Sequence, residues 1–183
     1  MNLVYLLPVG KIAPSLLDDL RDAIPKKLPV RCEIPPLTLD PTPSYHTERQ
    51  QFHSSEILQR MQNLVRPEDW RLLAVTEVDL YIPILKYVFG EAQIGGPCAL
   101  VSVFRLRQEF YGLERDHALL RKRLLKESVH ELGHTLDLRH CQDYRCVMAS
   151  SHAVEWIDIR ENSLCPACRN ELTSNVRSQL PTS

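Results

Sequence analysis

Histidines within a helical stretch constrain this chain more than any other feature of its sequence. The segment His130-Glu131-Leu132-Gly133-His134 places two histidines one helical turn apart on one face, where both imidazoles can bind one zinc ion. His140 lies six residues beyond His134, and a continuing helix would carry it away from that metal. His140 can therefore reach the same ion only if the helix ends near Asp137 and the chain turns back.

The third histidine decides between two interpretations of this segment. Two histidines with this spacing also occur as surface residues of ordinary helices. A catalytic zinc requires three protein ligands and an open position, so His130, His134 and His140 are the predicted ligands. Glu131 would then accept a proton from a water molecule that zinc acidifies.

A group of cysteines follows the histidines directly. Cys141, Cys146, Cys165 and Cys168 form two pairs with the spacing of a closed, tetrahedral zinc site. The alternatives are disulfides and a redox dithiol at the second pair, although a redox pair normally opens a helix after a strand. Because Cys141 is the next residue after His140, the two predicted zinc sites must lie next to each other.

Composition and charge give no sign of a nucleic acid or an acidic membrane as partner, since the net charge is −1. No stretch approaches the roughly 20 apolar residues of a membrane span. The short apolar N-terminus, interrupted by Pro8, is a poor signal peptide. We therefore expect a cytoplasmic protein, in which thiols stay reduced. Cys32 and Cys98 stand apart from the other cysteines and are predicted to be small buried residues.

Strands and helices alternate along most of the chain. Apolar periodicity predicts helices at 15–24, 54–64 and 116–136. Strands are predicted at 3–7, 29–34, 71–76, 87–92 and 99–106. This order predicts an α/β fold with a twisted, mostly parallel sheet of about five strands, backed by helices. We expect a single domain of residues 1–183, in which a sheet and helix lobe (1–139) and a small irregular lobe (140–183) enclose a cleft.

Over residues 73–170 the chain resembles the archaemetzincins, a family of metzincin zinc metallopeptidases. The family signature HExxHxxGxxHC-x4-C-x-M, with a later CxxC, corresponds to HELGHTLDLRHC from His130, then Cys146-Val147-Met148, then CPAC from Cys165. The resemblance implies a metzincin-like fold with an antiparallel edge strand, here Tyr87–Ala92, that holds an extended peptide. It also implies that Met148 forms the Met-turn beneath the catalytic metal and that the four cysteines bind a second, structural zinc.

The function implied by the resemblance is that of a zinc metallopeptidase, either an endopeptidase or an aminopeptidase. It would hold two zinc ions per chain, use Glu131 as general base and act on a peptide or a small protein. We expect a monomer that binds neither nucleic acid nor membrane. A zinc-stabilised scaffold with little or no turnover is the main alternative, and Glu131 favours the enzyme because a scaffold needs no base there. A redox protein is a third possibility and would require reactive thiols.

One position departs from the family signature. Asp137 stands where the signature has glycine, at the point where the chain must leave the helix. Glycine accepts a positive φ there readily, and aspartate tolerates it better than most residues, at a cost of roughly 1 kcal/mol. Alternatively, Asp137 could orient a ligand histidine through a hydrogen bond. Residues predicted to lie outside the metal sites are His46, His53, His117, His152 and the basic run Arg121–Arg123, which is expected to be a solvated helix face.

Overall fold

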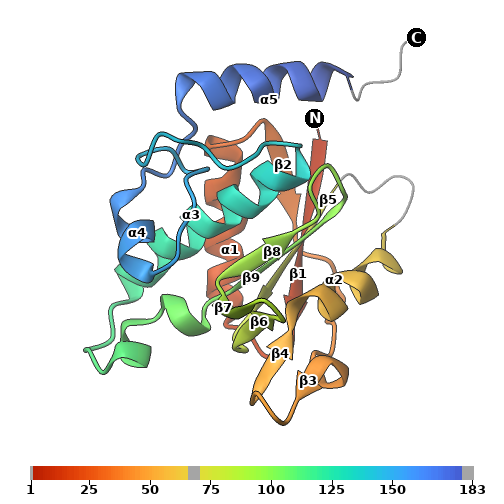
Figure 1. The fold of residues 1–183 in the computed structure, drawn as a ribbon. Helices are drawn as coiled ribbons and strands as arrows, with labels where there is room; N and C mark the ends of the chain where they lie inside the picture. The colour runs from red at the N-terminus through yellow and green to blue at the C-terminus, as the bar shows by residue number, and fades with distance from the viewer. Residues whose placement is uncertain (1, 66–70, 179–183) are drawn as a thin grey trace.

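A five-stranded sheet forms the centre of the protein (Figure 1). The structure, a computed structural model, describes residues 2–65 and 71–178. The strand order is β2-β1-β5-β9-β8, and every neighbouring pair is parallel except β8 with β9. The strands are β1 (Asn2–Val9), β2 (Val30–Glu33), β5 (Arg71–Thr76), β8 (Gly90–Ala92) and β9 (Cys98–Ser102). The predicted mostly parallel sheet with an antiparallel edge strand is confirmed.

Alternate residues of the central strands point to opposite faces of this sheet. Leu6 is buried in a core that also holds the apolar side chains of α1 (Pro14–Ala23) and α3 (His117–Thr135). Leu7 belongs to a second core, which is shared with α2 (Ser54–Gln62). Helices therefore cover both faces of the sheet, as expected for an α/β fold.

A second sheet of four short strands adjoins the first, in the order β3-β4-β6-β7. Its members are β3 (Tyr45–His46), β4 (Gln51–His53), β6 (Leu80–Ile82) and β7 (Leu85–Val88). The prediction of a single strand at Tyr87–Ala92 was wrong, because the chain passes from one sheet to the other at Phe89. This side chain is buried in the main core, so β7 ends before it and β8 begins after it.

Short 3-10 helices connect several of these elements. They are η1 (Ile24–Lys26), η2 (Thr42–Ser44), η3 (Phe104–Leu106) and η4 (Gln108–Tyr111). The strand predicted at 99–106 ends early because the Ser102 hydroxyl accepts a hydrogen bond from the N–H of Phe104 (3.0 Å). A serine that bonds the backbone two residues on favours a turn over continued strand.

The C-terminal segment packs beside α3 and contains two helices that the sequence analysis did not predict. They are α4 (Val154–Ile159) and α5 (Pro166–Ser178), drawn in blue in Figure 1. Ile157 of α4 and Leu172 of α5 reach the core that α3 shares with the sheet. This segment is therefore more regular than expected. Within residues 2–65 and 71–178, no helix is long and apolar enough to cross a membrane.

Candidate active site

The last two turns of α3 are buried all the way round, from residue 127 to residue 135. Two predicted ligands lie there, and buried polar side chains need hydrogen-bond partners. The Nδ1 atom of His130 lies 2.8 Å from the carbonyl oxygen of Val147, and that of His134 lies 2.8 Å from the carbonyl oxygen of Leu138. An Nδ1–H that donates to a carbonyl leaves the lone pair on Nε2. Both imidazoles are thus arranged to offer Nε2 as a ligand.

The end of α3 returns the third histidine to the other two. The N–H of Leu138 donates to Gly133 (3.0 Å) and the N–H of Asp137 donates to His134 (3.0 Å), which is the Schellman pattern of a helix end. Asp137 has a φ of 64°, so the predicted left-handed residue is confirmed. After this turn, the His140 ring centroid lies 4.9 Å from that of His134. We call His130, His134 and His140 the histidine cluster.

The donor atoms of the histidine cluster fit a metal ion. One ring nitrogen from each histidine lies within 4.8 Å of the others. The Nε2 atoms of His130 and His134 are 3.1 Å apart, and with both protons on Nδ1 two lone pairs face each other. A cation between them removes this repulsion. Burial lowers the pKa of all three imidazoles, and the Arg160 cation adds to this effect at His130, so the rings are neutral and able to bind metal.

Glu131 lines a cleft of about 700 Å³, and the histidine cluster lines the same cleft. The edge strand β8 lines the same cleft. A Cβ atom added to Gly90 would lie 2.6 Å from Oε1 of Glu131, so this carboxylate lies directly against the edge strand. Burial, together with the negative charge of Glu127, raises the pKa of the Glu131 carboxyl well above its usual range.

Met148 packs against the part of α3 that carries the histidines. It is fully buried, and a Cβ added to Gly133 would meet both its Sδ and its Cε, the latter at 2.9 Å. A glycine at position 133 therefore allows the thioether to approach the helix backbone. The Met148 carbonyl accepts a hydrogen bond from the N–H of Cys141 (2.9 Å). Met148 therefore packs against the helical turn that carries His130 and His134, and its role as the Met-turn stays a prediction.

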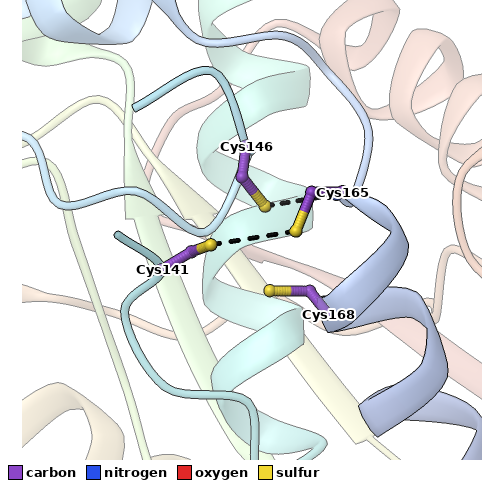
Figure 2. Close-up of side chains that lie close together, drawn as sticks. All are labelled: Cys141, Cys146, Cys165 and Cys168. Carbon is purple, nitrogen blue, oxygen red and sulfur yellow. Dashed lines mark hydrogen bonds between the residues drawn. The ribbon is translucent and has the colours of Figure 1, made fainter. Parts of the chain in front are cut away.

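The four C-terminal cysteines direct their sulfur atoms toward one another (Figure 2). Their ligand atoms all lie within 4.8 Å of one another, and the sulfurs of Cys141 and Cys165 are 3.8 Å apart. A tetrahedron with Zn–S distances of about 2.3 Å has edges of about 3.8 Å, whereas a disulfide would need about 2.05 Å. All six cysteines of the chain are free. The cysteine cluster, Cys141, Cys146, Cys165 and Cys168, therefore fits a tetrahedral metal ion.

Backbone contacts around this cluster also suit a metal site. The N–H of Cys165 donates to the sulfur of Cys146, and the N–H of Asp143 donates to the sulfur of Cys141, each at 3.4 Å. Cys165 does stand at the start of a helix, as in a redox pair, but the segment before it is a loop. Cys32 and Cys98 lie apart and are buried, as predicted. Burial raises the pKa of Cys98 to about 11.

The other four histidines have separate surroundings. His46 lies 3.1 Å from a carboxylate oxygen of Glu56, and the His53 ring accepts the N–H of Glu56 at the start of α2. His117 is exposed at the start of α3. His152 lines the cleft, where its carbonyl accepts a hydrogen bond from the Tyr87 hydroxyl (2.9 Å).

Two buried charged residues beside the histidine cluster were missed by the sequence analysis. Glu127 and Arg160 are 3% and 2% exposed and form an ion pair. Glu127 had a detectable signal, because a glutamate on the predicted inward face of a helix is unusual. Arg160 had none, since it lies far along the chain in a segment without clear periodicity.

Asp137 offers a direct test of the helix end. We expect Asp137→Gly to change the free energy of unfolding by no more than about 1 kcal/mol, because relief of backbone strain is offset by greater freedom in the unfolded chain. Zinc affinity should be unchanged, since His134 bonds the Leu138 carbonyl rather than the Asp137 carboxylate. Asp137→Val should be much more harmful, because a β-branched residue resists positive φ. Denaturant unfolding and zinc competition measure both effects, and a tenfold loss of zinc affinity in the glycine variant would instead assign Asp137 an orienting role.

Known proteins are similar to this chain over most of its length. Residues 30–174 match the sequence model of Peptidase family M54. The chain is 39% identical to an archaemetzincin of Methanocaldococcus jannaschii, over 92% of each chain. This chain belongs to the archaemetzincin family. An archaemetzincin of Pyrococcus furiosus is 33% identical over 96% of this chain and 94% of its own length.

Solved structures of archaemetzincins share this fold. The archaemetzincin of Archaeoglobus fulgidus, crystallised with malonate, superposes with a TM-score of 0.80 at 32% identity, over 92% of this chain and 99% of that one. A zinc-dependent peptidase of Methanocorpusculum labreanum superposes with a TM-score of 0.83 at 26% identity, with the same coverage. The predicted fold class and the family resemblance are both confirmed.

Proposed function

We propose that this archaemetzincin-family protein is a zinc metallopeptidase that cleaves peptide bonds in the cleft beside β8. The histidine cluster would hold a catalytic zinc, and the cysteine cluster would hold a structural one. The observation that carries the proposal is the convergence of three imidazoles beside a buried carboxylate in one cleft. Zinc bound there would supply Lewis-acid chemistry, which polarises a peptide carbonyl and acidifies water.

Glu131 is the residue that would move the proton. It follows His130 on α3, and its Oε1 lies against the edge strand, beside the place where a substrate backbone would lie. From there it can accept the proton of the attacking water and later deliver that proton to the amine of the departing peptide. A scaffold would gain nothing from this buried carboxylate, so Glu131 favours the enzyme.

The edge strand supports an extended peptide as the substrate. Among the described residues, β8 pairs with β9 on one side and leaves its other edge free for a peptide backbone. The hydrogen bond from Tyr87 to the His152 carbonyl joins β7 to the opposite wall and narrows the cleft. This narrowing favours short or unfolded peptides over folded proteins. A cytoplasmic location and a monomeric state stay predictions.

A peptide-library digest with metal depletion tests the proposal. Mild chelation should remove zinc from the open histidine cluster before the closed cysteine cluster, so zinc should fall from two ions to one per chain. Cleavage should disappear with that first ion and return when one equivalent of zinc is added. Cleavage that persists with the histidine cluster empty would contradict the mechanism, and a zinc-loaded protein that cuts no peptide would favour the scaffold.

Gly90→Ala should impair both hydrolysis and stability. The added Cβ would meet Glu131 and would also lie 2.7 Å from the carbonyl oxygen of Leu100, which is part of the backbone of β9. Relief requires a shift of the edge strand, so we expect a loss of about 1–3 kcal/mol in stability. We also expect at least about a tenfold loss in kcat through displacement of Glu131. Thermal unfolding and peptide cleavage measure the two effects, and wild-type kcat would show that the edge strand does not confine Glu131.

A further inference from the structure

The buried guanidinium of Arg160 contacts the carbonyl groups on both sides of Met148. Arg160 follows the last turn of α4, and its side chain is 1% exposed. Its Nη1 donates to the carbonyl oxygens of Val147 (2.9 Å) and Ala149 (2.7 Å). One side chain therefore fixes the backbone of the methionine turn at two points.

The same nitrogen also lies beside the ring of His130. Nη1 of Arg160 is 2.9 Å from Nδ1 of His130, and an arginine nitrogen cannot accept a hydrogen bond. Nη1 carries two hydrogens and lies within hydrogen-bond distance of three groups: the carbonyl oxygens of Val147 and Ala149 and the Nδ1 atom of His130. When both hydrogens go to the two carbonyls, His130 keeps its own proton on Nδ1 and donates it to the Val147 carbonyl oxygen, which lies 2.8 Å away.

Glu127 holds the guanidinium in this orientation. It lies on α3, one turn before His130, and its carboxylate binds Nη2 of Arg160. The Glu127 side chain is 4% exposed, so the pair is shielded from water. A planar guanidinium can serve a carboxylate and two carbonyls at once, which the single ammonium group of lysine cannot do with the same geometry.

We propose that Arg160 is a positioning residue for the metal site: it fixes His130 as the Nδ1–H tautomer, with Nε2 free for the metal, and it ties the Met148 turn to α3. The inference rests on the zinc site of the proposed function. It predicts that the loss of Arg160 weakens zinc binding by the histidine cluster through a residue that does not touch the metal.

Zinc affinity and thermal stability separate positioning from a merely structural role. We expect Arg160→Met to lower the thermal stability, because Glu127 is left buried without a partner. We also expect it to lower the zinc affinity, because the guanidinium no longer positions His130. In the double variant Glu127→Leu with Arg160→Met, no unpaired charge remains, so the melting temperature should recover toward the wild-type value. Zinc affinity of the histidine cluster, measured by competition with a chelator, should stay about 10- to 100-fold weaker. A double variant with recovered stability and wild-type zinc affinity would overturn the inference.

Arg123 provides a matched control. It is 5% exposed and also links α3 to α4, through an ion pair with Asp158 (2.6 Å), and it donates to the carbonyl of Leu106. Arg123→Met should lower the melting temperature and leave zinc affinity within about twofold of wild type. An equal loss of zinc affinity in this variant would show that any damage to the α3 and α4 contact has the same effect.

Arg160→Lys keeps the test decisive if the double variant does not fold. It keeps the charge beside Glu127 and loses the planar fork. Nitrogen NMR of the imidazoles should show the Nδ1–H tautomer of His130 in the wild type and a mixture of tautomers in Arg160→Lys, and zinc binding should be about tenfold weaker. Unchanged tautomer and affinity would refute the inference. Absence of zinc from the wild-type histidine cluster would contradict the proposed function, whereas the tautomer comparison would still judge the role of Arg160.

Discussion

Glu131→Gln should reduce peptide hydrolysis by at least about a hundredfold and leave the zinc content unchanged. Glutamine has the same shape as glutamate, so it can occupy the space beside Gly90 without displacing the edge strand. Its amide cannot accept the proton of the attacking water at any pH near neutrality. The variant therefore removes the base and keeps the packing and the three imidazoles.

Glu91→Gln is the control for loss of a negative charge in the same cleft. Glu91 follows Gly90 in β8, but its carboxylate accepts hydrogen bonds from the hydroxyls of Ser54 and Ser55 of α2. We expect its effect on kcat to be less than about tenfold. Steady-state cleavage of one peptide and metal analysis of each variant give the comparison. Equal kcat in wild type and Glu131→Gln would remove Glu131 from the mechanism.

Cys168→Ser should lower the melting temperature on the order of 10 °C. Cys168 belongs to α5, whereas Cys141 follows a predicted ligand and Cys146 begins the turn that contains Met148. A zinc ion bound by these thiolates would link α5 to two segments of the histidine site, namely the segment that carries His140 and the turn that contains Met148. Serine is a poor zinc ligand, so the cross-link should fail and zinc binding by the histidine cluster should weaken indirectly.

Cys32→Ala shows what the loss of an isolated buried thiol does. Cys32 lies in β2, does not belong to the cysteine cluster, and is 8% exposed. We expect a decrease of only a few degrees in melting temperature from the lost packing and no change in zinc content. Calorimetry and metal analysis of both variants make the comparison. A melting temperature of Cys168→Ser equal to that of the wild type would show that the four thiolates do not cross-link this part of the chain.

Local spacing explains which parts of the site could be predicted from sequence. His130 and His134 lie one helical turn apart. Asp137 lies at a helix end, where only a few backbone conformations let the chain leave the helix. The positions of these residues, the left-handed φ of Asp137 and the convergence of the cysteines agree with the predictions.

Long-range contacts explain what could not be predicted. Arg123 was expected on a solvated face, and that prediction was wrong, because Asp158 pairs with it from a helix that the sequence did not indicate. The contacts of Arg160 are likewise with backbone carbonyls on either side of Met148, which only the folded chain brings close to it. The division of the edge strand at Phe89 depends on the second sheet, whose strands are two to four residues long and too short for a clear alternation.

Anomalous X-ray scattering at the zinc absorption edge, from crystals grown with zinc, tests the central claim most directly. We expect two peaks per chain, one among the ring nitrogens of His130, His134 and His140 and one among the four cysteine sulfurs. The first peak should be lost on mild chelation, and the second should persist. A zinc-loaded crystal with no peak among the three histidines would contradict the catalytic site proposed for this protein.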